Sequence, residues 1–383
     1  MEFSNIEEDS FEAERRERRE RMKEEKRRQA AKRAMLKKMI PLIIVGIIAV
    51  IIIIVAIVFG IRALSDKHKI KEEQALESVE IAVPEIPQVI EEPEPKEPEI
   101  KNMLPITVES PQMFEGYKID ASGAYAGITE EEVQSQYLSI IDASTGKVLA
   151  TRNGADRMNP ASMTKVMTAL VACEHITDLN DMFTITIEDT DFAYVHDLSC
   201  AGFTADETVP VRDILYGAIM PSGGECCHAL ERYVAGSEEE FIQMMNDKAR
   251  ELGLTGTHFT NSAGLYGDDH YTTLYDMSMI MKAAIENDIC RQVLHEHMHV
   301  TKPTEQHPEG LELSNWFMRR IEDKYTKTEV MGAKTGYVVQ SGNCAVSYTI
   351  GSDGKVYICA TGNAHSAWRA IFDHVALYEK YVE

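Results

Sequence analysis

The chain carries little positive charge for its length. Its 383 residues include 39 lysines and arginines against 62 aspartates and glutamates, which gives a formal net charge of −23. The acidic surplus lies beyond residues 1–38, because that segment holds 13 basic and 10 acidic residues. A surface of this sign repels phosphate backbones, so the sequence excludes nucleic acid as a partner. We find no internal repeat.

Cysteine is scarce and odd in number. The seven are Cys173, Cys200, Cys226, Cys227, Cys290, Cys344 and Cys359. In an exported domain an odd set leaves at least one thiol free or intermolecular. Cys173 and Cys359 lie in apolar periodic segments and are expected in the core. Two interpretations stay open for Cys226 and Cys227: buried free thiols, or a disulfide from one of them to Cys200.

A long apolar run covers residues 40–61. At about 1.5 Å per residue, this run is long enough to cross a hydrocarbon core of ~30 Å. Residues 15–38 are dense in arginine and lysine, so the positive-inside rule places the N-terminus in the cytoplasm. A cleavable signal peptide is the less favoured alternative, because such apolar regions usually span about 7–15 residues and no clear A-x-A site follows.

Composition divides the chain into four segments. We expect a charged cytoplasmic tail (1–38), a transmembrane helix in the lipid bilayer (39–63), an extracytoplasmic linker (64–118) and one large domain (119–383). The linker is rich in glutamate and proline and cannot bury a core.

The domain itself alternates strand and helix signals. Strand hairpins are predicted near 137–150 and 345–361, and a helix over 364–381 closes the chain. With helices between the hairpins, the pattern predicts an α+β fold, an antiparallel sheet covered by helices.

Residues 159–168, NPASMTKVMT, contain a hydroxyl and an amine three positions apart. Asn159 suits an N-cap and Pro160 the first helical position, so a helix start is predicted here with Ser162 and Lys165 on one face. A serine needs a neighbour that takes its proton, and a lysine does so only when neutral. Burial and the helix dipole both lower a lysine pKa. The pair is a candidate nucleophile and base, although an S-x-x-K also occurs by chance on surface helices.

Two further segments follow in order. Ser222 lies in a P-S-G-G turn after the apolar, helix-like residues 214–220. A K-T-G at 334–336 leads into a β-branched run that predicts a strand, where Gly336 would let a substrate backbone approach closely. The series S-x-x-K, S-x-x, K-T-G is the pattern of penicillin-recognising enzymes.

Over about residues 119–378 the chain therefore resembles the serine-type D-alanyl-D-alanine carboxypeptidases, the low-molecular-mass penicillin-binding proteins. Residues 209–217, 259–265 (F-x-N-x-x-G-L) and 272–277 are similar to further family segments. The family usually reads S-G-N at the second motif, and here the third residue is Gly224. A missing amide hydrogen bond is worth about 0.5–1.5 kcal/mol, which slows an enzyme without abolishing it. We expect Gly224→Asn to raise or redirect activity.

The resemblance implies a β-lactamase/DD-peptidase-like fold and a two-step acyl transfer. Ser162 would attack the substrate, Lys165 would act as base and Ser222 would relay the proton, with Lys334 tuning the local field.

The third motif would bind the substrate, through Lys334, Thr335, Gly336 and Tyr337. Lys334 and Thr335 would hold its terminal carboxylate. The N–H groups of Ser162 and Tyr337 match the family's oxyanion hole.

The implied partners are peptidoglycan stem peptides, with β-lactam antibiotics as covalent inhibitors, and no metal or cofactor is implied. Two alternatives stay open. A β-lactamase or DD-endopeptidase would use the same motifs, although we cannot place the deacylating glutamate of a class A lactamase. A wall-binding pseudoenzyme would have lost catalysis through Gly224.

Residues 295–299 read H-E-H-M-H and match the H-E-x-x-H metalloprotease motif. Zinc needs both outer histidines on one helix face and a third ligand. The following residues 300–303 suggest an extended segment with alternating histidines, so the sequence does not favour a zinc site.

Overall fold

The computed structural model describes residues 108–123 and 127–383. The predicted tail, the predicted transmembrane helix and most of the predicted linker lie outside these residues. Among the residues that are described, no helix is both long and apolar enough to cross a membrane.

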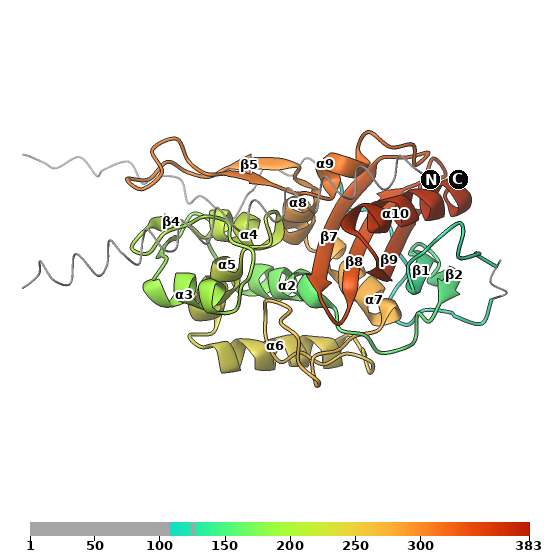
Figure 1. Ribbon diagram of the computed structural model, residues 1–383, viewed down its shortest axis with the longest axis horizontal. Coiled ribbons are helices and arrows are strands. Elements are labelled where there is room, and N and C mark those ends of the chain that lie inside the picture. Colours follow the sequence, from blue (N-terminus) through green and yellow to red (C-terminus); the bar gives the residue numbers. More distant parts are fainter. Residues whose placement is uncertain (1–107, 124–126) are drawn as a thin grey trace, which may run out of the picture. The chain divides into compact units, whose positions relative to one another are not determined.

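A five-stranded antiparallel sheet forms the centre of the domain (Figure 1). Its strand order is β2-β1-β9-β8-β7, so the first and last hairpins of the chain meet where β1 pairs with β9. Both predicted hairpins are confirmed. The strands are β1 (Tyr137–Asp142), β2 (Lys147–Arg152), β7 (Val330–Val338), β8 (Gly342–Ile350) and β9 (Val356–Ala364).

Most helices are inserted between β2 and β7. They are η1 (Ala161–Thr164), α2 (Lys165–His175), α3 (Ile187–Val195), α4 (Val211–Ile219), α5 (Gly224–Val234), α6 (Glu238–Glu251), α7 (Leu274–Glu286), α8 (Asp288–His295) and α9 (Met318–Ile321), followed at the C-terminus by α10 (Ala367–Tyr381). Two short strand pairs accompany them, β3 (Met182–Thr184) with β4 (Thr208–Pro210) and β5 (Met298–Val300) with β6 (Glu312–Ser314). In Figure 1 the helices α2 to α6 lie beside the β7 edge of the sheet. The expected α+β class is confirmed.

The sheet separates two apolar cores. In β9, Ile358 and Ala360 belong to the larger core that includes α2, α4, α5 and α7. The intervening Tyr357 and Cys359 belong to the smaller core beneath α10 and α9. Because side chains alternate along a strand, this central strand is buried on both faces. The edge strand β7 is therefore attached to a sheet whose centre is packed on both faces.

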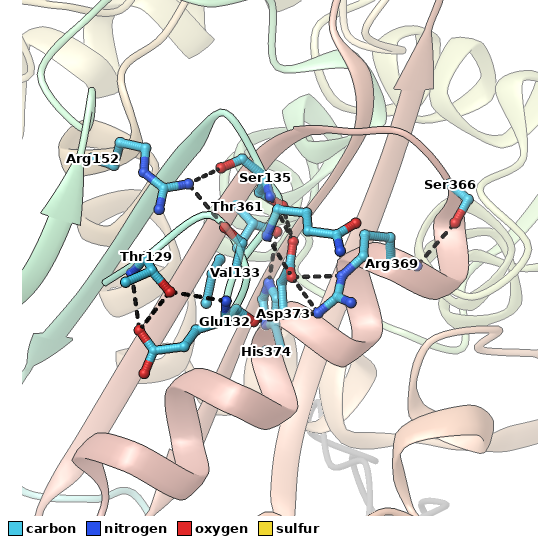
Figure 2. Close-up of polar contacts among 11 residues, drawn as sticks. Thr129, Glu132, Val133, Ser135, Arg152, Thr361, Ser366, Arg369, Asp373 and His374 are labelled. Carbon is cyan, nitrogen blue, oxygen red and sulfur yellow. Dashed lines mark hydrogen bonds and ion pairs between the residues drawn. The ribbon is translucent and has the colours of Figure 1, made fainter. Parts of the chain in front are cut away.

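A buried carboxylate fixes α10 to the segment before β1 (Figure 2). Asp373 accepts hydrogen bonds at Oδ1 from Gln134 N (3.1 Å) and Arg369 Nε (2.7 Å), and at Oδ2 from Ser135 N (2.8 Å). The helix begins three residues later than predicted, because residue 364 still belongs to β9 and Ser366 provides the N-cap.

The packed domain begins before the expected boundary at residue 119. Val108 is buried and its carbonyl accepts a hydrogen bond from Arg291 Nε (3.2 Å). Phe114 N donates to Ala143 O (3.0 Å). The last residues assigned to the linker by composition thus pack on the domain, because composition does not register a few isolated anchoring side chains.

Candidate active site

The S-x-x-K segment departs from the predicted helix start. Residues 161–164 form a 3-10 turn, and the α-helix begins only at Lys165. Ala161 has φ 49°, a left-handed conformation that is costly for a residue with a Cβ and incompatible with a continuous α-helix. Asn159 holds this turn, since its Oδ1 accepts from Ala161 N (2.9 Å). The turn nevertheless brings Ser162 and Lys165 together.

Lys165 lies within hydrogen-bond distance of the nucleophile candidate. Its Nζ is 3.0 Å from Ser162 Oγ and donates to the Ala263 carbonyl at 2.6 Å. The side chain is fully buried, and burial lowers the pKa of its amine. A neutral amine that donates to Ala263 can direct its lone pair at the serine hydroxyl, which is the geometry required of a general base.

Ser222 and Lys334 form a second hydroxyl–amine pair. Ser222 follows α4 in a turn, as predicted, and has φ 66°. Lys334 lies on β7, and its Nζ donates to Ser222 Oγ and to Thr335 O, both at 3.0 Å. Burial, followed by the nearby charge of Lys165, holds the pKa of Lys334 well below its usual value. All four side chains of the predicted machinery thus belong to one site.

Two glycines allow the turn around Ser162 to pack closely. A Cβ at Gly336 on β7 would lie 2.8 Å from Ser162 N. A Cβ at Gly264, which has φ 84°, would lie 1.9 Å from Ala161 O. Any larger residue at either position would displace Ser162. Both positions need glycine for close backbone approach.

The K-T-G segment lies on an edge strand. In the described five-stranded sheet β7 pairs only with β8, so its other edge faces the helical part of the domain. Thr335 is half-buried, and Tyr337 is exposed. An edge strand offers backbone donors and acceptors to an extended peptide. Within the described sheet, the strand therefore has one edge without a neighbouring strand, and this edge lies beside Ser162.

One residue that positions the site carries no signal in the sequence. His270 is buried, and its Nε2 lies 2.9 Å from Thr164 Oγ1, while its Nδ1 accepts from Thr260 N (3.0 Å). Burial lowers the pKa of His270 to about 4, so the neutral ring donates from Nε2 to Thr164. No motif pointed to His270. By contrast, Asn261 lies in the recognised F-x-N-x-x-G-L segment, and its Oδ1 accepts from Gly264 N (2.7 Å).

Gly224, the departure from the family pattern, is the first residue of α5. A Cβ at this position would lie 2.6 Å from Leu198 Cδ1 and 2.8 Å from Leu198 Cβ. The space for a side chain is therefore occupied. The expected gain from Gly224→Asn alone needs revision, because the asparagine would collide with Leu198.

The suggested disulfide to Cys200 is not formed. Cys226 and Cys227 are buried free thiols in the first turn of α5, whereas Cys200 is exposed. Burial raises the pKa of both buried thiols, which keeps them protonated.

The histidines of the H-E-x-x-H match have three different partners. His295 contacts Met331 O (2.8 Å), His297 contacts Glu322 (2.6 Å) and His299 contacts Asp213 (2.8 Å). Helix α8 ends at His295 and β5 runs over Met298–Val300, so the expected extended segment is present. The two outer histidines do not share a helix face.

This fold and this arrangement of two hydroxyls and two buried amines define the class of penicillin-recognising serine proteins. The chain belongs to the D-alanyl-D-alanine carboxypeptidase family, whose model matches residues 125–364.

Among curated relatives, the chain is 37% identical over 151 residues to the D-alanyl-D-alanine carboxypeptidase DacF of Bacillus subtilis, a match that covers 38% of each chain. It is 33% identical over 187 residues to DacC of Escherichia coli, which covers 47% of each. These matches span less than half of the relatives' own length. Among solved structures, the Streptomyces K15 DD-transpeptidase superposes with a TM-score of 0.60 at 25% identity, over 67% of this chain and all of that one.

Proposed function

We propose that the protein is a membrane-anchored serine-type D-alanyl-D-alanine carboxypeptidase that removes the terminal D-alanine from peptidoglycan stem peptides. The observation that carries the proposal is the 3.0 Å contact between Ser162 Oγ and the buried Lys165 Nζ. In the described part of the chain, neither Lys165 nor Lys334 forms an ion pair with a carboxylate. A lysine buried in this way is suited to proton transfer.

Acylation proceeds by proton transfer between these groups. Ser162 Oγ attacks the carbonyl carbon of the penultimate D-alanine, and its proton passes to the neutral Lys165. The C–N bond then breaks, and the leaving amine of the terminal D-alanine takes a proton relayed by Ser222. In the second step water attacks the ester on Ser162, which releases the shortened peptide and returns the proton to the hydroxyl. Each step is acyl transfer by a nucleophile and an adjacent base.

Substrate binding uses β7. The peptide lies along the open edge of this strand, and Lys334 with Thr335 holds its terminal carboxylate, which restricts the enzyme to chain ends. The close approach at Gly336 brings the scissile carbonyl near the N–H groups of Ser162 and Tyr337. Two such donors stabilise the developing oxyanion, and losing one typically costs about 10²–10³ in rate.

The composition of the N-terminal segments supports a location of this chemistry outside the cell membrane. Residues 39–63 would anchor the chain in the bilayer with residues 1–38 in the cytoplasm, and residues 64–118 would tether the domain near the wall. Protease treatment of intact protoplasts tests this orientation, since it should remove the domain and spare the tail. Protection of the domain would overturn it.

Intact-mass measurement with benzylpenicillin tests the activity. A stable penicilloyl adduct on Ser162, together with D-alanine release from a stem-peptide mimic, is expected. Rapid hydrolysis of the antibiotic would identify a β-lactamase, and cleavage of crosslinked peptides in preference to chain ends would identify an endopeptidase. Ligand binding without an adduct would identify a pseudoenzyme.

A further inference from the structure

The carbonyl of Ala263 contacts both reacting side chains. Lys165 Nζ donates to Ala263 O at 2.6 Å, and Ser162 Oγ lies 3.4 Å from the same oxygen. The bond to the carbonyl occupies one N–H of Lys165 and thereby sets the direction of the amine's lone pair. A general base needs that direction fixed, because a misplacement of about 1 Å can cost about 10²-fold in rate. The position of Ala263 O therefore matters for acylation.

Ser262, the residue before Ala263, is held by side chains of two helices. Its carbonyl accepts from Thr168 Oγ1 (2.7 Å), one turn beyond Lys165 on α2. Its hydroxyl donates to Oε1 of Glu231 on α5. Thr168, Ser262 and Glu231 are all fully buried. The backbone that leads into Ala263 is thus fixed from both sides in the core.

Glu231 links this backbone to the helix of the second motif. Helix α5 begins two residues after Ser222, and Glu231 lies further along the same helix. Its bond to Ser262 therefore joins the helix that follows Ser222 to the segment whose carbonyl binds Lys165. The arrangement connects both hydroxyl–amine pairs of the site through one buried side chain.

Glu231 is an unfavourable residue for a core position. Its Oε2 is buried and contacts no hydrogen-bond partner among the described residues. Burial raises the pKa of Glu231 to about 7, and in either protonation state Oε1 can accept from Ser262. A buried polar atom without a partner lowers stability. Folds retain such groups where activity requires them.

We infer that Glu231 is a positioning residue for acylation, which fixes the Ala263 carbonyl through the Ser262 hydroxyl and so holds the amine of Lys165 against the nucleophile. Glu231 itself contacts neither reacting group. The inference rests on the proposed function, because it takes Lys165 as the base for Ser162.

Substitutions at the two partners of this bond separate the acceptor from the charge. Glu231→Gln keeps an acceptor oxygen, so acylation should stay within about threefold of wild type. Glu231→Leu has a similar volume and no acceptor. Its maximal acylation rate should fall about tenfold or more, with an unchanged half-saturating concentration of benzylpenicillin, because the loss concerns alignment of the base and not binding. Ser262→Ala breaks the same bond and should give the same loss.

The double variant Glu231→Leu/Ser262→Ala separates positioning from stability. It replaces both partners of a buried hydrogen bond by apolar groups, so its melting temperature should equal or exceed that of wild type. Its acylation should be as slow as in Glu231→Leu, because the two changes act on one bond and their effects do not add. Slow acylation in a fully stable protein is not a result of destabilisation.

The experiment uses the full-length chain in mild detergent, as wild type and the four variants. Acylation rates are measured over a range of benzylpenicillin concentrations, kcat and KM with a stem-peptide mimic, and the melting temperature by thermal denaturation. Glu207→Leu is the matched control, since Glu207 is equally buried and its Oε1 accepts from Thr304 (2.7 Å) in the β5–β6 hairpin. It should lower the melting temperature and leave acylation by the folded protein unchanged.

Slow acylation in the double variant at a native melting temperature, together with the activity of Glu231→Gln, supports the inference. Acylation by the double variant within about twofold of wild type overturns it, and this result decides the matter even where Glu231→Leu fails to fold. A loss in Glu231→Gln as large as in Glu231→Leu, or a loss confined to the half-saturating concentration, also overturns it. Failure of the wild-type chain to form an adduct on Ser162 rejects the proposed function instead.

Discussion

Two buried polar clusters lie at different parts of this domain, the active-site cluster beside β7 and the cluster around Asp373 beneath α10. In the second, both carboxylate oxygens are satisfied, by Arg369, by Ser135 and by backbone N–H groups (Figure 2). In the first, Lys165 and Lys334 contact only hydroxyl and carbonyl oxygens within the described residues. The ionisable side chains of the two clusters are buried to a similar degree, but only the cluster around Asp373 pairs its buried charge with an opposite charge.

This difference in charge pairing distinguishes a cluster that stabilises the fold from a cluster that is suited to proton transfer. A buried ion that is paired and fully hydrogen-bonded keeps its charge and ties elements together, and breaking it is costly. A buried amine without an opposite charge lowers its pKa instead and becomes available for proton transfer. Among the residues of these two clusters, only Ala161 and Ser222 of the first have a left-handed backbone. Strain of this kind persists where function requires it.

Removal of the nucleophile should have the largest effect on acylation, and it tests whether the active-site cluster carries the reactivity. Ser162→Ala is expected to reduce acylation by at least about 10³-fold, because it removes the oxygen that forms the ester with the substrate. Stability should change little, since Lys165 keeps its bond to Ala263. Adduct formation and thermal denaturation are measured together. The matched control is Ser347→Ala, which removes a buried hydroxyl bonded to His374 and Tyr378 and should lower stability while acylation persists. Normal acylation by Ser162→Ala would contradict the mechanism.

Replacement of Asp373, whose charge is paired, should lower stability and leave acylation unchanged. Asp373→Asn leaves Arg369 without its carboxylate partner and is expected to lower the free energy of unfolding by about 3 kcal/mol. Acylation by the folded fraction should be unchanged. Denaturant titration measures the loss, with Glu132→Gln as control, because the ion pair of Glu132 with Lys380 is exposed and screened by solvent, so its removal should cost much less. A larger loss of unfolding free energy in Glu132→Gln than in Asp373→Asn would show that the cluster around Asp373 does not stabilise the fold in this way.

The sequence predicts the parts of both clusters that depend on local pattern. Ser162 and Lys165 are neighbours in the chain, and the hairpins 137–150 and 345–361 are marked by alternation and turn residues, so these predictions hold within a few residues. The order of the three short motifs also predicted that Lys334 and Ser222 lie in the same site.

The sequence does not predict contacts between distant segments that lack a motif. Leu198 meets Gly224 because α3 and α5 pack together, and His270 reaches Thr164 across more than a hundred residues. The sequence left two interpretations open for Cys226 and Cys227, buried free thiols or a disulfide to Cys200, and only the packing of α5 shows that both thiols face the core. The predicted helix start at Pro160 was wrong, because the left-handed φ at Ala161 delays the α-helix until Lys165.

Removal of the uncompensated amine should abolish activity and increase stability. In Lys165→Met, acylation is lost, and the free energy of unfolding near pH 7 is expected to rise, because folding of the wild-type chain has to deprotonate Lys165 in order to bury it and methionine avoids that cost. The gain follows from the lowered pKa of Lys165. It should be present below the unfolded pKa of about 10.4 and vanish above it. Denaturant titration at pH 7 and pH 10.5 measures both values. A loss of stability at pH 7 would show that Lys165 is compensated after all.

The smallest expected effect is a change in the pH dependence of stability when one buried histidine of each cluster is replaced. Burial lowers the pKa of His374 to about 3 and that of His270 to about 4, so both stay neutral in the folded chain at pH values where the unfolded chain is protonated. Each therefore stabilises fully above the unfolded pKa of about 6.5, and its contribution falls by about 1 kcal/mol between pH 6.5 and pH 5.5.

The two substitutions should reduce this acid sensitivity equally and differ in activity. In His374→Gln the slope of unfolding free energy against pH becomes shallower by that amount, and acylation persists because the hydrogen-bond partners Ser347 and Thr361 belong to the cluster beneath α10 and not to the active site. In His270→Gln the same change in slope should come with slower acylation, since His270 holds Thr164 in the turn of Ser162. Denaturant titrations at the two pH values and acylation rates at pH 7 measure both. Equal acylation by the two variants would mean that the turn does not depend on His270.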